Sequence, residues 1–192
     1  KGILSVFICV LMLCTVMPIT GHAADNAASV TFGGNTENYT TIDAAWTAAV
    51  ALDTTAENKA TIKLLTNCKT ENTLTNTEDY LVLDTNAKTL TTPDAIYSST
   101  SPSSVTCGIC VEGGSLELIG GGTITGVSLA SYGMAILLIN GGKVTANGIT
   151  IHNTGTNGSN PVRIDGGEFY LIDSHLITDD EYALYAAKGK VY

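Results

Sequence analysis

Apolar and polar residues alternate along the second half of the chain, and the pattern recurs between short turns. The turns fall at Gly113-Gly114, Gly141-Gly142, Gly166-Gly167 and Lys188-Gly189, so successive repeats are 28, 25 and 22 residues long. Alternation of this kind is typical of β-strands that bury one face. A repeat of twenty-odd residues built from such strands and glycine turns predicts a β-solenoid.

Apolar residues recur at three positions relative to these turns. The three sets are Ile109, Leu137, Val162 and Leu184; Val111, Ile139, Ile164 and Ala186; and Leu116, Val144, Phe169 and Val191. We expect each set to form a buried ladder, because neighbouring coils of a solenoid stack at roughly the interstrand spacing of 4.8 Å. A meander or a sandwich would show the same alternation, but it would not need like residues at like positions. The pattern therefore favours a parallel β-helix.

A single amphipathic helix is predicted over residues 40–52. Its apolar face is formed by residues at i, i+3, i+4, i+7 and i+8, namely Ile42, Ala45, Trp46, Ala49 and Val50. Thr40 with Asp43 resembles a capping box. Because Trp46 lies on the apolar face, we expect it to pack in the core and not to stack on a carbohydrate. The helix would cover the N-terminal end of the solenoid, since solenoids need capped ends.

The region before the regular repeats is expected to form a short strand at residues 29–32 and further strands at 61–65 and 80–84. Residues 84–90 resemble a turn that leads back into a strand, as in an imperfect first coil. Residues 91–106 are rich in Ser, Thr and Pro and predict a loop or an insertion. The expected organisation is residues 24–60 as strand and capping helix and residues 61–192 as coils. Because the sequence stops within an expected strand, we expect a truncated C-terminus and a longer natural protein.

Residues 1–23 have the features of a secretory signal peptide. An apolar run over residues 3–16 is followed by Gly21-His22-Ala23, which predicts cleavage after Ala23. An uncleaved membrane anchor is the alternative, although the run is short for a membrane span. We expect a secreted or cell-surface protein that meets the membrane only through this segment.

The expected mature chain is acidic. Removal of residues 1–23 leaves 8 basic and 18 acidic side chains, a formal charge of −10. Such a surface repels nucleic acid and anionic lipid headgroups. It also argues against a polyanionic polysaccharide partner unless calcium bridges the two.

Three cysteines remain in the mature chain: Cys68, Cys107 and Cys110. The spacing of the last two matches a thioredoxin-type motif, but that motif needs a helix N-terminus, and residues 107–111 alternate like a strand. On a strand, Cys107 would share a face with Ile109 and Val111, and Cys110 would point the other way. Buried free thiols, or a disulfide from Cys68 to one of the pair, are the expectations.

Several segments resemble secreted right-handed parallel β-helix proteins of the pectate-lyase-like superfamily, closest to surface proteins of Gram-positive gut bacteria. The resemblance rests on Thr61–Leu65, Leu81–Thr91, Val111–Leu118 and Gly122–Gly126 and covers about residues 29 to 192. Asn86-Ala87 replaces the usual Asn-Gly turn. The resemblance implies the fold but not one function, because the same fold carries lyases, hydrolases and adhesins.

Enzymes of this superfamily suggest candidate catalytic residues. The lyases use an Arg or Lys base with calcium held by acidic residues, and the hydrolases use Asp with His and a basic residue. The corresponding residues here are Arg163, Asp165, Asp173, His175, Asp179, Asp180 and His152. Arg163 and Asp165 lie two apart on one strand, which predicts an ion pair. Asp179-Asp180 fits a corner, and neither His has metal-ligand spacing.

A non-catalytic domain that serves adhesion or glycan binding is therefore the expected function, with a polysaccharide or a host or cell surface as partner. The alternative is the N-terminal part of a polysaccharide lyase or glycoside hydrolase. No cofactor is expected for the non-catalytic domain. Calcium is expected only if the chain is part of a lyase. Five tyrosines could contact glycans, but they do not repeat at the coil period, so no aromatic row is expected: Tyr132, Tyr170, Tyr182, Tyr185 and Tyr192.

Overall fold

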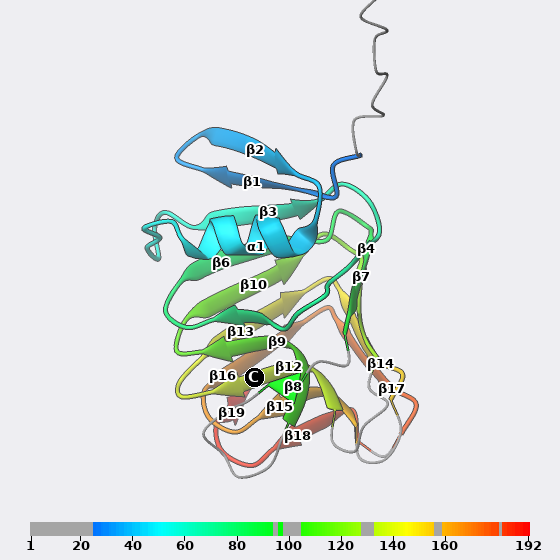
Figure 1. The fold of residues 1–192 in the computed structure, drawn as a ribbon. Helices are drawn as coiled ribbons and strands as arrows, with labels where there is room; N and C mark the ends of the chain where they lie inside the picture. The colour runs from blue at the N-terminus through cyan, green and yellow to red at the C-terminus, as the bar shows by residue number, and fades with distance from the viewer. Residues whose placement is uncertain (1–24, 94–95, 98–104, 128–132, 156–158, 181) are drawn as a thin grey trace, which may run out of the picture.

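Strands make up nearly all the regular structure, and they form three sheets (Figure 1). The computed structural model describes residues 25–93, 96–97, 105–127, 133–155, 159–180 and 182–192. Within these residues α1 (Ile42–Val50) is the single α-helix. The prediction of an all-β chain with parallel sheets is confirmed.

The three sheets have eight, five and six strands. The first contains, in spatial order, β19 (Lys190–Val191), β16 (Glu168–Ile172), β13 (Lys143–Asn147), β10 (Ser115–Ile119), β6 (Tyr80–Asp84), β3 (Ala60–Leu64), β1 (Ala28–Phe32) and β2 (Asn35–Tyr39). The second contains β17 (His175–Thr178), β14 (Thr150–Asn153), β11 (Thr123–Gly126), β7 (Thr89–Thr92) and β4 (Cys68–Lys69). The third contains β18 (Leu184–Ala186), β15 (Asn160–Ile164), β12 (Gly133–Ile139), β9 (Val105–Glu112) and β5 (Leu74–Asn76), and β8 (Ile96–Tyr97) pairs with β9.

From β3 onward, the chain visits the eight-, five- and six-stranded sheets in turn. Each sheet therefore gains one strand for every turn of the chain, and consecutive strands of a sheet pair in parallel. Among the described strands, antiparallel pairs involve only β1 with β2, β1 with β3, and β8 with β9. Parallel pairing places equivalent residues of successive turns side by side.

Stacked aliphatic side chains fill the space between the sheets. On the eight-stranded sheet one ladder runs through Leu81, Leu116, Val144 and Phe169, all buried, and ends at the exposed Val191. The predicted register from Leu116 to Val191 is confirmed, whereas the predicted burial holds for Leu116, Val144 and Phe169 but not for Val191. Full burial of such a side chain contributes about 1.5–3 kcal/mol, so these ladders are the main source of stability.

The other two predicted ladders are wrong by one residue in β12. Ile109 pairs with Ile136, which in turn pairs with Val162, whereas Leu137 pairs with Cys110 on the neighbouring strand. In the same way, Leu138 and not Ile139 is the partner of both Val111 and Ile164. The partners in β15 and β18 are as predicted.

The extra residue that causes this shift lies in the turn after β12. Asn140 has a φ of +52° and precedes Gly141, so this turn is one residue longer than the turn at Gly113. After the turn, Val144 is again in register with Leu116. A shift of one residue exchanges the two faces of a strand, and this is why Leu137 lies outside the main core.

The helix α1 lies at the N-terminal end of the stack (Figure 1), as expected for a cap. Its N-cap is Thr41 and not Thr40: the Thr41 hydroxyl accepts a hydrogen bond from the Ala44 backbone N–H at 3.1 Å. Asp43 instead accepts a hydrogen bond from the Asn72 backbone N–H at 3.0 Å. Trp46 is buried and its indole N–H donates to the Thr75 carbonyl at 2.8 Å, which confirms its structural role.

Three strands have sequences too polar or too short to be predicted: β2, β4 and β5. The first complete turn of the chain therefore begins at β3, and β4 and β5 lie between the predicted strands at residues 61–65 and 80–84. The segment 91–106 is not all loop, since β7 continues to Thr92 and β9 begins at Val105. Residues 94–95 and 98–104 of this segment lie outside the described residues.

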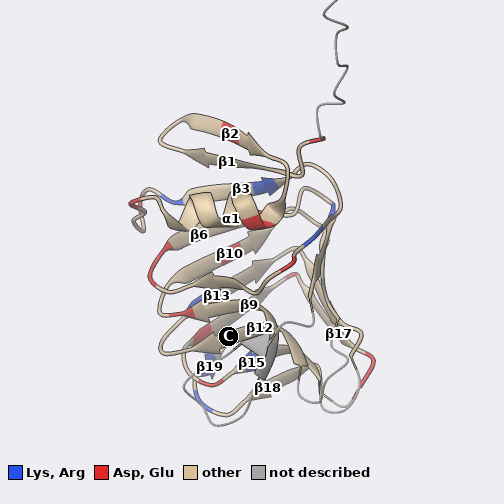
Figure 2. Cartoon of the chain, in the orientation of Figure 1, with Lys and Arg blue, Asp and Glu red and all other residues tan. Residues whose placement is uncertain are grey.

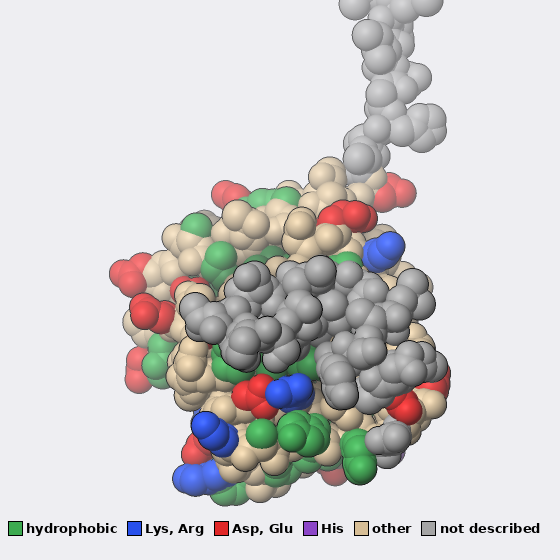
Figure 3. All heavy atoms as spheres, turned by 60° about the horizontal axis from the view of Figure 1, so that its bottom comes forward, with side chains coloured by type: hydrophobic (Ala, Val, Ile, Leu, Met, Phe, Trp, Pro, Cys, Tyr) green, Lys and Arg blue, Asp and Glu red, His purple; other side chains and the backbone are tan. Residues whose placement is uncertain are grey.

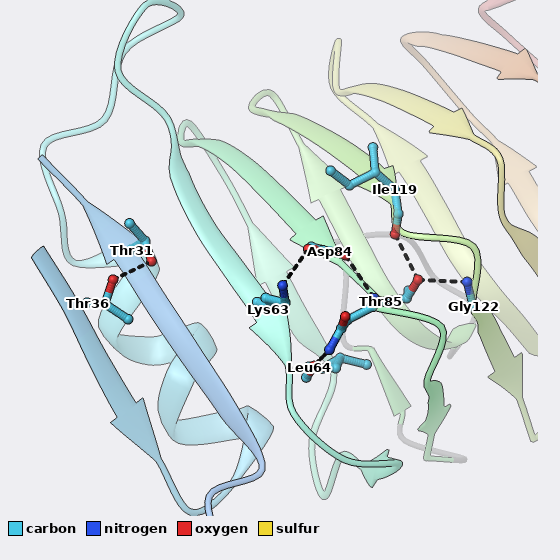
Figure 4. Close-up of polar contacts among 9 residues, drawn as sticks. Thr31, Thr36, Lys63, Leu64, Asp84, Thr85, Ile119 and Gly122 are labelled. Carbon is cyan, nitrogen blue, oxygen red and sulfur yellow. Dashed lines mark hydrogen bonds and ion pairs between the residues drawn. The ribbon is translucent and has the colours of Figure 1, made fainter. Parts of the chain in front are cut away.

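Polar contacts connect neighbouring turns of the chain where they change sheets (Figure 4). The buried Thr85 hydroxyl donates to the Ile119 carbonyl at 2.8 Å and accepts from the Gly122 backbone N–H at 2.9 Å. On the other side, the Asn86 side-chain amide donates to the Leu64 carbonyl at 3.0 Å. These bonds connect each change of sheet to the backbone of the neighbouring turn of the chain.

The turn between β6 and β7 contains a residue in an unfavourable conformation. Asn86 and Ala87 have φ values of +49° and +57°, and the Lys88 N–H donates to the Thr85 carbonyl at 2.8 Å. Two left-handed residues define a type I′ turn, for which Asn-Gly is preferred. Alanine at the second position is strained, because its Cβ crowds the following carbonyl.

We therefore expect Ala87→Gly to raise the free energy of unfolding by about 1 kcal/mol. Urea denaturation followed by circular dichroism measures the change. The matched control is Ala51→Gly, at an exposed position with an ordinary φ of −86°, where added chain entropy should lower stability. A loss of stability in both variants would contradict the turn assignment.

A close contact between a small and a larger residue shapes the corner between the five- and six-stranded sheets. A Cβ at Gly108 would lie 2.1 Å from Thr92 Oγ1 and 2.2 Å from Thr92 Cβ. In the next turn of the chain the sizes are reversed: Gly126, the lateral neighbour of Thr92, packs against Ala135. At this corner, each of the two turns of the chain therefore needs a glycine: Gly108 opposite Thr92, and Gly126 opposite Ala135.

We expect Gly108→Ala to lower the free energy of unfolding by about 2 kcal/mol, as overpacking does. The double variant Thr92→Gly with Gly108→Ala recreates the Gly126–Ala135 arrangement, so the two substitutions should couple favourably. A double-mutant cycle from urea denaturation measures this coupling. If the changes in unfolding free energy of the two single variants simply added up in the double variant, Thr92 and Gly108 would not compete for the same interior space.

Gly108 also determines which face of the six-stranded sheet the Cys107 side chain lies on. Because Gly108 faces the buried Thr92 and Ile109 belongs to the main core, two consecutive residues of β9 face inward. Cys107 consequently lies with Cys110 in a separate cluster and not with Ile109 and Val111. The predicted shared face of Cys107 and Ile109 is wrong for this reason.

Candidate functional site

The outer face of the eight-stranded sheet carries two adjacent rows of side chains, which are polar or aromatic except for the buried Val82. They alternate with the buried ladder and so point away from the core. Strand pairing places the first row at Tyr80, Ser115, Lys143, Glu168 and Lys190. The second row contains Val82, Glu117, Thr145 and Tyr170. We call these rows, together with Tyr192, the tyrosine–lysine strip.

Two tyrosines stack at the C-terminal end of the strip. The rings of Tyr170 and Tyr192 have centroids 4.5 Å apart and an interplanar angle of 10°. Backbone pairing holds them together, since the Tyr192 N–H donates to the Phe169 carbonyl and the Leu171 N–H donates to the Tyr192 carbonyl. The two tyrosines are 22 residues apart, which is the length of the last repeat. The prediction that the tyrosines do not repeat at the coil period is therefore wrong for this pair.

Charged groups surround the stacked rings. The Tyr170 hydroxyl donates to Glu168 Oε2 at 2.9 Å, and Lys190 Nζ lies 3.4 Å from Glu168 Oε1. The hydrogen bond to Glu168 raises the pKa of Tyr170 to about 12, and the same bond, with Lys190, lowers the pKa of Glu168. Lys143 Nζ lies 4.8 Å from the centroid of the Tyr170 ring, in a cation–π arrangement.

A hollow of about 180 Å³ continues the strip toward its N-terminal end. It is lined by Ala56, Lys59, Tyr80, Ser115, Leu116, Glu117, Lys143 and Thr145. Lys59 and Glu117 form an ion pair at its wall. Because Lys143 contacts both the hollow and the Tyr170 ring, the hollow and the tyrosine stack form one continuous surface.

A second hollow, of about 220 Å³, lies between α1 and the β1–β2 hairpin. It is lined by Val30, Phe32, Asn35, Glu37, Tyr39, Ala48 and Leu52. Its polar groups bond to each other, since the Tyr39 hydroxyl donates to Glu37 Oε2 at 2.9 Å. This hollow is mainly apolar and lies away from every predicted candidate residue.

Arg163 and Asp165 form the ion pair that their spacing predicted. Arg163 Nε donates to both carboxylate oxygens of Asp165, at 3.0 and 2.9 Å. The guanidinium also lies 5.3 Å from the centroid of the Tyr185 ring. Both residues belong to the six-stranded sheet and its following turn, away from the tyrosine–lysine strip.

The remaining predicted candidates lie on or beside the five-stranded sheet. His152 Nε2 is 3.1 Å from Asp179 Oδ1, and Asp180 Oδ2 accepts from the Ser159 N–H at 3.2 Å. His175 lies beside Thr150, and Asp173 has a φ of +44° in the turn before it. The bonds therefore join the candidates in separate pairs on two sheets and do not connect Arg163 with His152.

Charges and metal-ligating residues are dispersed over the described surface. Acidic residues are spread along the described part of the chain (Figure 2). In the described part of the chain, no group of three or more His, Cys, Asp and Glu side chains could hold a metal ion. None of the candidate residues therefore forms a calcium cluster with its neighbours among these residues.

In the described part of the chain Cys68, Cys107 and Cys110 form no disulfide, so the expected disulfide from Cys68 is not formed. Cys68 lies on β4 in the five-stranded sheet, and its thiol donates to the Ala27 carbonyl at 3.3 Å. Cys107 and Cys110 lie on β9 in the six-stranded sheet and are buried.

Exposed apolar side chains gather in the last turn of the chain. Ile172, Ile177, Tyr182, Tyr185, Val191 and Tyr192 are all exposed. Hydrophobic side chains are visible at this C-terminal end, which comes forward in Figure 3. Leu171, Leu176 and Leu184 there are only half-buried, whereas their ladder partners in the preceding turns are fully buried.

No protein-family model, curated protein or solved structure matches this chain. Among the described residues, no helix is long and apolar enough to cross a membrane. The predicted signal peptide, residues 1–23, and Tyr132 lie outside the described residues.

The Tyr170–Glu168 bond predicts a change in titration. We expect Glu168→Ala to lower the pKa of Tyr170 from about 12 toward its ordinary value of about 10, because the acceptor and the repelling charge are both removed. Ultraviolet difference titration against a Tyr170→Phe reference measures this. Glu117→Ala, which removes a carboxylate paired with Lys59 instead, should leave the titration unchanged. An unshifted Tyr170 in Glu168→Ala would contradict the bond.

Proposed function

We propose that this chain is a right-handed parallel β-helix domain that binds glycans without catalysing a reaction on them. Three observations support the fold: repeats of 22 to 28 residues, three sheets visited in turn, and parallel pairing between successive turns. The resemblance to the pectate-lyase-like superfamily agrees with this assignment. Residues 1–23 support export, so the partner would be a polysaccharide or a host or cell surface.

The observation that carries the proposal is the stacked Tyr170–Tyr192 pair beside a hollow whose lining includes Lys, Glu, Ser and Thr side chains. Tyrosine offers an apolar ring face for the C–H groups of a sugar and a hydroxyl for its oxygens. Tyr192 is 56% exposed and Tyr80, at the opposite end of the strip, is 36% exposed, so both rings are accessible. Between them, Ser115, Lys143 and Thr145 supply the hydrogen-bonding groups that sugar hydroxyls require.

The shape of the strip fits an extended chain. From β6 to β19 it crosses five adjacent strands, which at about 4.8 Å per step is roughly 19 Å. A ligand of repeating units could contact equivalent positions of successive turns. Alternating charges on Lys143, Glu168 and Lys190 favour a ligand with many hydroxyl groups over a strongly charged one.

The binding mode predicts that Tyr170→Ala weakens glycan binding about tenfold or more, since it removes the stacking partner that orients the exposed Tyr192 ring. Screening of the purified protein on a glycan array identifies the ligand, and isothermal titration calorimetry measures the affinity. Tyr185→Ala is the matched control, because Tyr185 also lies under a cation, Arg163, but on the six-stranded sheet.

Equal loss of affinity in both variants would contradict the proposed strip. The bound glycan should be recovered intact after incubation. Release of unsaturated or reducing fragments that is abolished by Arg163→Ala or Asp179→Ala would overturn the non-catalytic assignment and favour a lyase or a hydrolase.

A further inference from the structure

A small cluster outside the main core contains three sulfur-bearing side chains. Cys107, Cys110, Met134 and Leu137 pack together, each at most 3% exposed, and Ile139 packs against them. The cluster lies on the face of the six-stranded sheet opposite Ile109 and Val111, which belong to the main core. It is also on a different sheet from the tyrosine–lysine strip.

The backbone brings the sulfur atoms to one face. Cys107 on β9 is the lateral neighbour of Met134 on β12, and Cys110 is the lateral neighbour of Leu137. In both strands two consecutive residues face inward, Gly108 with Ile109 and Ala135 with Ile136. This shared irregularity turns Cys107 and Met134 outward together and keeps them beside Cys110.

The two thiols contact each other. The pKa of Cys107 is raised well above its ordinary value, mainly by a hydrogen bond between Cys107 and Cys110 and secondly by burial. The Thr73 hydroxyl donates to the Cys107 carbonyl at 2.7 Å and fixes the backbone of the pair. The Cys107 thiol is therefore protonated near neutral pH and is held next to Cys110.

We propose that Cys107, Cys110 and Met134 form a binding site for a soft monovalent metal ion, Cu(I). Thiolate and thioether sulfurs are the ligands that select Cu(I). Zinc in a structural site requires four N, S or O ligands, and the described chain offers no third His, Cys, Asp or Glu beside the two thiols. Hard cations such as calcium require oxygen ligands, which this apolar cluster lacks.

Binding would proceed without a change of oxidation state. Each thiol loses its S–H proton to solvent as a Cu–S bond forms, and the Met134 thioether adds a neutral ligand. Two thiolates and one Cu(I) leave a single negative charge, which is smaller than the charge of two bare thiolates. The metal therefore compensates for the cost of ionising two buried thiols.

The test is a titration of the reduced protein with Cu(I) under argon, in competition with bicinchoninate. We expect one Cu(I) per chain, bound by sulfur ligands alone in X-ray absorption spectra. Cys110→Ser should weaken binding by more than about 100-fold, because one anionic soft ligand is lost. Met134→Leu, which preserves the packing, should weaken it about tenfold, because only a neutral ligand is lost.

Cys68→Ser is the matched control, since Cys68 is a free thiol on another sheet, and it should bind Cu(I) as the unmodified protein does. Circular dichroism checks that each variant is folded. Absence of competition with bicinchoninate would overturn the proposal, as would loss of binding in Cys68→Ser. Unchanged Cu(I) affinity in Met134→Leu would overturn the three-sulfur site. A Cys107–Cys110 disulfide that mass spectrometry still finds after reduction of the protein would also overturn it.

Discussion

The parallel register between successive turns of the chain is the constraint on which the rest of this structure depends. Because side chains alternate across a strand, the register decides at once which residues fill the interior and which form the surface. The interior ladder from Leu81 to Phe169 is continuous although the repeats differ in length. Turns absorb the differences, as Asn140 does after β12 with its left-handed conformation. A residue added within a strand, by contrast, would exchange its two faces.

The same constraint builds the surfaces. Once the inward positions are committed to aliphatic residues, the outward positions of each sheet form rows that cross several turns of the chain. On the eight-stranded sheet these rows bring together Tyr80, Lys143 and Tyr170, which are far apart in sequence. The six-stranded sheet gathers sulfur atoms and an Arg163–Asp165 pair in the same way. Each sheet can therefore present a different chemistry above one shared core.

The two ends of the stack differ in how the core is closed. At the N-terminal end α1 and the β1–β2 hairpin cover it, with Trp46 buried and hydrogen-bonded to the turn below. In the last described turn the aliphatic side chains are only partly covered, and Val191 and Tyr192 are exposed. The proposed glycan surface reaches this less protected end through Tyr192. Its geometry thus depends on the pairing of a two-residue strand, β19, with β16.

The amino-acid sequence by itself determined the all-β class, the single amphipathic helix, the ladder from Leu116 to Val191 and the Arg163–Asp165 pair. These follow from local periodicity, which neighbouring residues in the chain specify. Only the tertiary structure decided the positions of Leu137 and Cys107, because each depends on how one turn of the chain fits against another: Asn140 lengthens a turn, and Gly108 packs against Thr92. The Tyr170–Tyr192 stack was hidden for a related reason. Its 22-residue spacing is meaningful only once β16 and β19 are known to be neighbours.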